Sequence, residues 1–339
     1  MTSIKTMVTD LISADALDLI LYPTEQCNFR CTYCYEDFSI GRMTEDVQLA
    51  VKRLISQQAR NVKLLTLAWF GGEPMVARDI MLDVARHAAA CASQSGTKLK
   101  GIVTTNGYFL TPKIMADFVA LGHDHFQVSL DGFGEDHDNT RKLISGGGTF
   151  ARIWRNLLDL RSTDLQFKVT LRLHLTRTNL ASIELLLSKL AEASFRSDKR
   201  FVVLFKIVNQ LADAPAADTA VLSRSEAPAV LEQMRALASG LDLDVAEPDQ
   251  IKVCYASRPN SVAIRATGKL QKCTVMLNDS ANDVGELMPD GTLRLEPKKM
   301  LPWMEGILTE DPSSLACPAG AISKARVASK HRTIPIEVV

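Results

Sequence analysis

Short apolar runs alternate with amphipathic segments through the first two thirds of the chain. Six of these runs are rich in aliphatic and aromatic residues, at 17–22, 63–70, 99–106, 125–130, 167–175 and 201–208. Helical spacing of apolar positions marks segments between them, such as 44–58, 78–94 and 149–162. Nearly continuous apolar strands that alternate with helices are typical of a parallel sheet built from βα units. We therefore predict an α/β fold, a partial (β/α)6 barrel that is open on one side.

Glycine-rich and polar segments follow the first four predicted strands. Cysteines follow 17–22, GGEP follows 63–70, NGYF follows 99–106 and DGFGEDHDNTR follows 125–130. In parallel α/β folds, ligands bind at the carboxyl ends of the strands. The pattern therefore predicts a single active site at that edge of the sheet.

The last third of the chain differs in composition. Residues 209–250 are rich in alanine and aspartate and predict a linker, then a helix that Ser223 or Ser225 caps. Residues 251–320 contain short strands with turns at Gly268 and at a PDG sequence, which predict a small α+β domain. The predicted parts are an N-terminal extension (1–16), the barrel (17–208), the linker and helix (209–250), the small domain (251–320) and a basic tail (321–339).

Composition excludes several classes of partner. Lys and Arg number 39 and Asp and Glu number 39, so charge gives no reason to expect nucleic acid or an anionic membrane as a partner. No apolar run is long enough to span a membrane, and the N-terminal segment lacks the apolar core of a signal peptide. We therefore expect a cytoplasmic protein, in which the seven cysteines indicate metal binding or catalysis rather than disulfides. Cys91, alone in an alanine-rich helix, is expected to be a small core residue.

Three cysteines stand close together after the first predicted strand. Cys27, Cys31 and Cys34 have the spacing C-x3-C-x2-C, with Tyr33 before the third. A structural zinc ion needs four protein ligands, and no further His or Cys follows within fifty residues. Thiolates favour iron–sulfur clusters, zinc or Cu(I), and a [4Fe–4S] cluster with one open iron fits three thiolates on a short loop. The residues alone leave zinc as the alternative.

The motifs, taken in order, resemble those of the radical S-adenosylmethionine enzymes. C-x3-C-x2-C after the first strand and GGEP after the second match that family, while TTNG, VSLDG and HDNTR match its peptide- and protein-modifying members. The resemblance covers residues 17 to about 320. It implies a [4Fe–4S] cluster whose open iron is chelated by S-adenosylmethionine. It also implies that an electron, from a donor such as flavodoxin or ferredoxin, cleaves this cofactor to a 5′-deoxyadenosyl radical that takes a hydrogen atom from the substrate.

The resemblance also implies roles for residues near the cysteines. Gly71 and Gly72 let the backbone approach S-adenosylmethionine closely, because they carry no side chain. Glu73 is expected to accept a hydrogen bond from the methionine ammonium, the alternative being a solvated loop carboxylate. Tyr33 is expected to lie against the adenine.

Further contacts are expected from the segment after the fourth strand. Ser129 suits a ribose hydroxyl or the methionine carboxylate, and Arg141 suits the carboxylate, because a guanidinium offers two parallel donors. The alternative for Arg141 is a surface arginine. Asn106 and Asp131 are expected to stabilise turns beside the site. The pattern assigns no catalytic acid or base.

The C-terminal cysteines resemble those of an auxiliary cluster domain. Cys254 and Cys273 belong to a C-x13-G-x4-C pattern similar to the opening of the SPASM domain or of its shorter version, twitch. Only Cys317 follows, so the resemblance implies one auxiliary iron–sulfur cluster, [4Fe–4S] in preference to [2Fe–2S], with a cysteine missing. Three explanations for the missing cysteine are open: an iron without a protein ligand, a ligand such as Asp279 or Asp283, or a domain without a cluster. Three buried structural cysteines are the simplest alternative.

The resemblance implies a function in peptide modification. The predicted reaction is a cross-link or oxidation in a ribosomally synthesised peptide, and the alternative is twitch-type oxidation of a carbohydrate or cofactor precursor. A non-catalytic electron carrier would leave GGEP and the barrel unexplained. Sixteen residues before the first strand are too few for a leader-binding domain. A separate protein, or an exposed strand edge of the barrel or of the small domain, is therefore expected to bind a leader.

Overall fold

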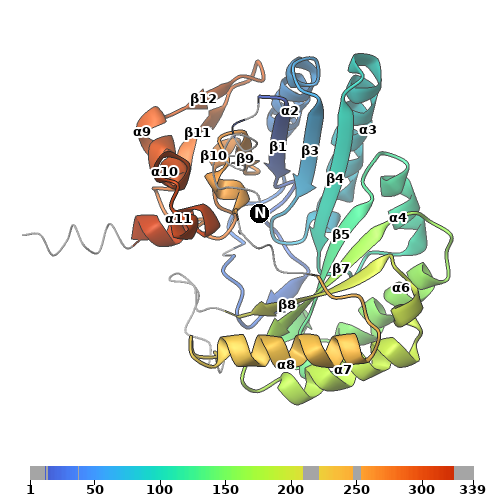
Figure 1. The fold of residues 1–339 in the computed structure, drawn as a ribbon. Helices are drawn as coiled ribbons and strands as arrows, with labels where there is room; N and C mark the ends of the chain where they lie inside the picture. Colours follow the sequence, from blue (N-terminus) through green and yellow to red (C-terminus); the bar gives the residue numbers. More distant parts are fainter. Residues whose placement is uncertain (1–11, 13, 37, 209–220, 247–252, 324–339) are drawn as a thin grey trace, which may run out of the picture.

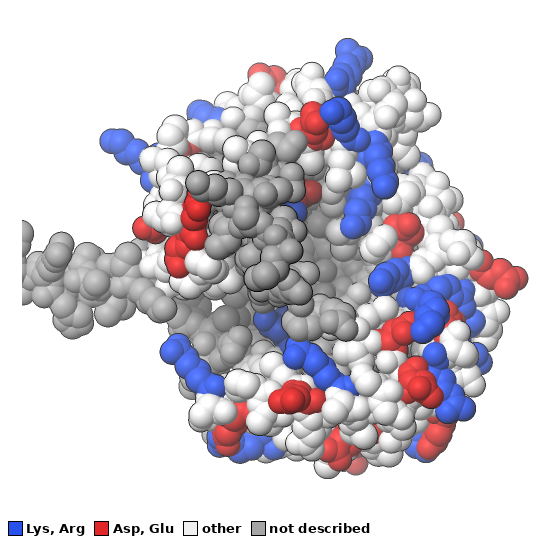
Figure 2. Space-filling view, in the orientation of Figure 1, with Lys and Arg blue, Asp and Glu red and all other residues white. Residues whose placement is uncertain are grey.

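The computed structural model describes residues 12, 14–36, 38–208, 221–246 and 253–323 (Figure 1). Most of the predicted N-terminal extension, part of the linker and most of the tail lie outside the described residues. No helix among these ranges is both long enough and apolar enough to cross a membrane. Figure 2 shows Lys and Arg side chains interspersed with Asp and Glu over the face that Figure 1 presents.

A twisted, largely parallel sheet forms the centre of the fold (Figure 1). Its parallel strands are β1 (Ala16–Leu21), β3 (Leu64–Trp69), β4 (Lys98–Thr105), β5 (His125–Leu130), β7 (Lys168–Leu175) and β8 (Phe201–Ile207). Each of them pairs in parallel with the next in that order. The predicted α/β fold with its parallel strands is therefore confirmed.

Helices connect these strands and cover the outer side of the sheet (Figure 1). They are α2 (Glu45–Gln58), η1 (Pro74–Ala77), α3 (Arg78–Ser95), α4 (Pro112–Val119), α5 (Glu135–Thr140), α6 (Phe150–Arg161), α7 (Leu180–Glu192), η2 (Phe195–Ser197) and α8 (Ala227–Gly240). The N-cap residue of α8 is Glu226, which makes no side-chain cap hydrogen bond, so the predicted serine caps are wrong. Ser223 lies in the preceding turn: its hydroxyl accepts from the backbone N–H of Glu226, whose carboxylate accepts from the N–H of Ser223.

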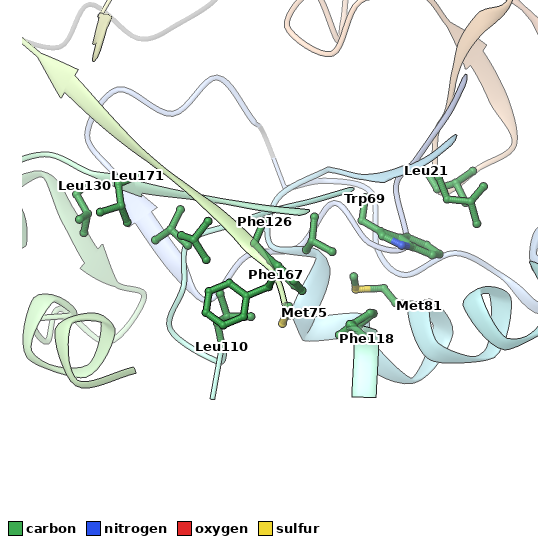
Figure 3. Close-up of a cluster of buried hydrophobic side chains, with 14 of the residues drawn as sticks. Leu21, Trp69, Met75, Met81, Leu110, Phe118, Phe126, Leu130, Phe167 and Leu171 are labelled. Atoms are coloured by element: carbon green, nitrogen blue, oxygen red, sulfur yellow. The ribbon is translucent and has the colours of Figure 1, made fainter. Parts of the chain in front are cut away.

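The hydrophobic core lies between the sheet and these helices (Figure 3). Trp69 and Phe126 of the strands are buried there with Met81 of α3 and Phe118 of α4. On each strand, alternate residues point to the other side of the sheet. That inner side carries the polar residues described below.

The C-terminal strands extend the same sheet, an arrangement that the sequence pattern did not predict. They are β9 (Ser261–Ile264), β10 (Lys269–Gln271), β11 (Asp283–Leu287) and β12 (Leu293–Leu295), followed by helices α9 (Pro297–Met300), η4 (Leu301–Met304), α10 (Glu305–Thr309) and α11 (Pro312–Ala316), with η3 (Tyr255–Ser257) before them. β9 pairs in parallel with β1, and β10 to β12 continue as antiparallel hairpins. The turn glycines Gly268 and Gly291 have φ of +85° and +89°, as the predicted turns require.

These pairings correct the expectation of open barrel edges. The outer edge of β1 is occupied by β9. On the opposite side, Val203 of β8 exchanges backbone hydrogen bonds with Asp244 and Ala246. Unpaired strand edges favour such pairing, because their N–H and C=O groups need partners. Among the described strands, β12 is left as the outer edge at the β9 end of the sheet.

A buried ion pair fastens the C-terminal strands to the cysteine loop. Glu25 is 0% and Arg265 5% exposed. The Arg265 guanidinium contacts both carboxylate oxygens of Glu25 and donates through Nη1 to the carbonyl of Leu277 at 2.9 Å. The backbone N–H of Ala266 faces the same carboxylate at 3.4 Å. Each charge is thus satisfied inside the protein.

Breaking this pair is expected to destabilise the protein strongly. In R265M the Glu25 carboxylate stays buried without its counter-charge, which should lower the free energy of unfolding by about 3–5 kcal/mol. The double variant E25L/R265M should lose less unfolding free energy than E25L and R265M lose in total. Urea denaturation measures the unfolding free energy of each variant. The control R294A removes an exposed pair with Glu286 and should change stability by less than about 1 kcal/mol. A similarly small loss for R265M would contradict the assignment.

Candidate active site

The three N-terminal cysteines lie on a loop that a small two-stranded sheet holds in place. β2 (Phe29–Cys31) pairs antiparallel with β6 (Arg141–Leu143), and Cys31 stands directly opposite Arg141. The backbone N–H of Phe29 donates to the Cys27 sulfur at 3.3 Å, and the N–H of Cys34 donates to the Cys31 carbonyl at 3.2 Å. The segment after β1 and the segment after β5 are thereby joined.

Burial shifts the acidity of all three thiols. It raises the pKa of Cys27 to about 12 and that of Cys34 to about 11, and it raises the pKa of Cys31 as well. The negative charge of Glu73 adds to the shift at Cys27. Without a bound cation these thiols are protonated at neutral pH. Loading with iron must therefore release protons.

The donor set fits an iron–sulfur cluster. Cys31 and Cys34 both contribute to raising the pKa of the Cys27 thiol. In a [4Fe–4S] cluster each thiolate binds a different iron, so three cysteines on one short loop can supply three of the four ligands.

Gly71 and Gly72 allow two stretches of backbone to touch. A Cβ at Gly71 would lie 2.3 Å from the carbonyl oxygen of Thr24, and one at Gly72 would lie 2.6 Å from that of Gln26. Gly71 also has φ of +115°, which disfavours other residues. The glycines therefore position the segment immediately before Cys27. Their predicted approach to S-adenosylmethionine stays a prediction.

Glu73 is fully buried, so its alternative as a solvated loop carboxylate is wrong. Its carboxylate accepts from the N–H of Met75 at 2.9 Å, the hydroxyl of Thr105 at 2.8 Å and the N–H of Asn106 at 2.6 Å. Burial raises the pKa of Glu73, and these hydrogen bonds oppose the shift. The side chain thus ties the end of β3 to the end of β4. A carboxylate has about four acceptor sites, so the predicted contact with the methionine ammonium stays open.

Asp131 organises a buried polar network instead of the turn expected for it. Its carboxylate accepts from the hydroxyls of Tyr33 and Thr140, each at 2.7 Å, and pairs with Nδ1 of His174 at 3.0 Å. Arg141 lies 3.9 Å away. Burial alone would raise the pKa of Asp131, but the hydrogen bond from His174 and the charge of Arg141 hold it well below its usual range. Sequence reasoning missed Thr140 and His174, since nothing local marks them as neighbours of Asp131.

Arg141 is 7% exposed, so its alternative as a surface arginine is wrong. Its Nη1 donates to the hydroxyl of Tyr33 at 2.8 Å. Its Nε is buried and has no hydrogen-bond partner among the described residues. The guanidinium therefore keeps donors for a carboxylate. The predicted contacts of Arg141 with the methionine carboxylate and of Tyr33 with adenine stay predictions.

Two other predicted residues occupy different positions around the site. Ser129 lies near the end of β5, on the inner side of the sheet, and pairs in register with Arg172 of β7. Asn106 accepts from the N–H of Tyr108 at 3.0 Å, the turn contact predicted for it. Its Nδ2 also donates to Asn28, within the cysteine loop, at 2.9 Å.

The C-terminal cysteines come close to one another. Burial raises the pKa of the Cys273 thiol, and charges on Cys254 and Cys317 add to the shift. Asn282, which sequence reasoning missed, holds this loop with all its amide groups. Its Oδ1 accepts from the N–H of Lys272 and of Cys273, and its Nδ2 donates to the carbonyls of Cys273 and Met276.

The aspartates considered as auxiliary ligands bond elsewhere. The Asp283 carboxylate accepts from Gln271 at 2.8 Å and pairs with Lys269 at 3.2 Å. Asp279 accepts from the N–H of Ala281 at 2.8 Å.

Cys91 stands apart from both groups of cysteines. It is partly buried on α3, with its sulfur 3.5 Å from Nε2 of His87.

Two curated proteins illustrate the sequence relationships. The AdoMet-dependent heme synthase of Methanosarcina barkeri is 30% identical over 151 residues, which cover 43% of this chain and 39% of that protein. The PqqA peptide cyclase of Xanthomonas euvesicatoria is 27% identical over 119 residues, which cover 35% and 30%. The matched segments thus span two fifths or less of these relatives.

Solved structures share the fold over most of the chain. Native anSMEcpe with bound AdoMet and Cp18Cys peptide superposes with a TM-score of 0.63 and 16% identity, covering 84% of this chain and 80% of that one. Streptococcus suis SuiB bound to the precursor peptide SuiA gives a TM-score of 0.54 and 12% identity, covering 82% and 64%. At these identities the likeness establishes the fold.

The family model of the radical SAM superfamily matches residues 21–190, half of the chain, including the cysteine loop and GGEP. Membership of this family implies a [4Fe–4S] cluster and S-adenosylmethionine. The loop of Cys27, Cys31 and Cys34 has the donors for that cluster, and Arg141 keeps donors beside it. The chain therefore belongs to the radical SAM superfamily.

Proposed function

We propose that the enzyme modifies a ribosomally synthesised peptide, taking a hydrogen atom from a side chain or the backbone to form a cross-link or an oxidised residue. One observation carries the proposal. The segment VSLDG…HDNTR, which resembles that of peptide-modifying members, contacts the cysteine loop directly. Asp131 and Arg141 of this segment both bind Tyr33, and Arg141 stands opposite Cys31. The peptides bound in the structures of anSMEcpe and SuiB support the same substrate class.

The protein's part in this chemistry is to hold and orient. When bound, the cluster and S-adenosylmethionine supply a 5′-deoxyadenosyl radical that can break an unactivated C–H bond. Cys27, Cys31 and Cys34 hold the cluster. Arg141 binds the methionine carboxylate, and Ser129 binds that carboxylate or a ribose hydroxyl. The remaining inner face of the sheet receives the substrate.

We also propose that Cys254, Cys273 and Cys317 bind an auxiliary iron–sulfur cluster in a domain spanning residues 251–320. Cross-linking or dehydrogenation removes two hydrogen atoms from the substrate, the second as a proton and an electron. The need to remove that electron gives a reason for a second iron–sulfur site. Cys254 and Cys317 both contribute to raising the pKa of the Cys273 thiol, which supports the proposal. An external donor such as flavodoxin or ferredoxin supplies the electron that starts the reaction.

A second candidate function is twitch-type oxidation of a small molecule. The similarity to the AdoMet-dependent heme synthase favours it, because that relative has the higher sequence identity of the two compared above.

Removing the first cluster is expected to abolish radical formation. Alanine at Cys27, Cys31 and Cys34 together removes every thiolate of the proposed site. After anaerobic reconstitution and reduction, chromatography should detect no 5′-deoxyadenosine from S-adenosylmethionine. The control C91A, outside both sites, should retain activity. Continued cofactor cleavage by the triple variant would show that the cluster is held elsewhere.

The auxiliary site predicts the iron content of that triple variant. Iron and sulfide analysis should find about one cluster per chain in it, and none once Cys254, Cys273 and Cys317 are also replaced by serine. N282A should reduce this content, because it frees the loop of Cys273, whereas exchange of the exposed Glu286 for alanine should not. A triple variant without iron would mean that the C-terminal cysteines are structural.

The substrate class can be tested with peptides encoded beside the gene. Reduced enzyme with S-adenosylmethionine should convert such a peptide into a product lighter by two hydrogen atoms, measured by mass spectrometry. Comparison of leader-bearing and leaderless peptides tests how the leader is bound. Binding that depends on residues 251–320 would support recognition by the auxiliary domain, whose β12 has an outer edge. Restored binding on adding a separate protein would support a leader-binding partner. Turnover of a carbohydrate or cofactor precursor, without any peptide, would favour the alternative.

A further inference from the structure

Arg172 lies on the inner side of the sheet, among the residues of the candidate site. Its neighbours on β7, Leu171 and Leu173, are buried in the core between sheet and helices (Figure 3). Because successive side chains of a strand point to opposite sides, Arg172 and His174 share the inner side. His174 contacts Asp131 and Tyr33 there.

Arg172 is partly buried, and its Nε is buried without a hydrogen-bond partner among the described residues. No ion pair to the guanidinium occurs in the described ranges. The residues beside it in register are Ser129 of β5 and Leu204 of β8, neither of which carries a negative charge. The charge of Asp131 reaches it, but that carboxylate already binds Tyr33, Thr140 and His174.

Burial lowers the pKa of Arg172. The nearby side chains of Tyr35, Tyr33 and Asp131 oppose this shift, whereas the charge of Arg141 adds to it. A partly buried guanidinium whose Nε lacks an acceptor is unfavourable, and a bound carboxylate would relieve this through two parallel hydrogen bonds.

Arg172 is distinct from the arginine expected to bind the cofactor. Arg141 stands opposite Cys31, on the small sheet that holds the cysteine loop. Arg172 belongs to the main sheet, and β7 makes no pairing with the cysteine loop. Arg141 also has its own unpaired Nε for the methionine carboxylate. The Nε of Arg172 is a second unpaired donor and is left for another anion.

We propose that Arg172 binds a carboxylate of the substrate and selects a peptide that presents an Asp or Glu side chain to the barrel interior. The proposal rests on the peptide-modifying function proposed above and narrows it to acidic target segments. Other sources of a carboxylate, above all S-adenosylmethionine itself, are separated by the experiment.

The first test asks whether Arg172 is structural. In reconstituted protein without substrate, R172M should raise the midpoint of thermal unfolding by about 2–4 °C, because it removes a partly buried charge whose Nε has no acceptor among the described residues. The control R200M should lower the midpoint, since Arg200 bonds to Asp198 and to the carbonyls of Arg161, Thr163 and Leu165. A loss of stability in R172M equal to that in R200M would overturn the proposal.

The second test uses two pools of degenerate heptapeptides that differ only in a central Glu or Gln. The reconstituted wild type should bind the Glu pool about tenfold more tightly, as expected for a charge-assisted pair. R172Q should bind both pools equally, and R172K should restore part of the preference. The affinity ratio of S-adenosylmethionine to its decarboxylated analogue should not change in R172Q.

Three other outcomes of this binding experiment would contradict the proposal. A reduced cofactor ratio in R172Q would make Arg172 a cofactor contact and overturn the proposal. Equal binding of both pools by the wild type would overturn it while leaving the peptide-modifying function intact. Binding of neither pool, by wild type or variants, would overturn the proposal together with the peptide substrate on which it rests.

Discussion

The position of the cysteine loop depends on close packing of the three residues before it. The backbone of residues 24–26 touches Gly71 and Gly72 so closely that no side chain fits between them. The Glu25 side chain is held on its other side by Arg265. Loops after β1, β3 and β9 therefore meet at one point. Because Cys27 follows directly, the geometry of the whole cluster site rests on this contact.

One side of the sheet packs into the hydrophobic core, and the other side carries the polar residues of the candidate site. Leu171 and Leu173 of β7 pack into the core, whereas Arg172 and His174, which alternate with them, face the interior. Packing fixes the strands, and the strands then hold polar groups where water is largely excluded. In such a place an ion pair or a hydrogen bond is stronger, and an unpaired charge is more unfavourable, than at the surface. The network of Asp131 and the unpaired Arg172 are the two consequences.

Much of the fold could be predicted from local patterns. The six apolar runs became the parallel strands, and the turn glycines Gly268 and Gly291 occur as expected. These features depend on residues close in sequence. The pairing of β9 with β1 and of β2 with β6 could not be predicted in this way. Strand partners are chosen by long-range fit, and short strands of three or four residues carry little pattern of their own.

By itself the sequence determined the chemistry available to this protein. Three thiols on one short loop indicated a metal or iron–sulfur site through residue type and spacing, and the resemblance of GGEP and VSLDG to a known family favoured the iron–sulfur cluster. Only the tertiary structure decided which side chains are already bound. Glu73 was expected to bind the cofactor and already accepts hydrogen bonds from Thr105 and Asn106 at the end of β4. Asp131 was expected to stabilise a turn and joins β5, β7 and the cysteine loop. The physical reason is that burial and hydrogen bonding depend on neighbours in space, which residues 33, 131 and 174 acquire only when the strands assemble.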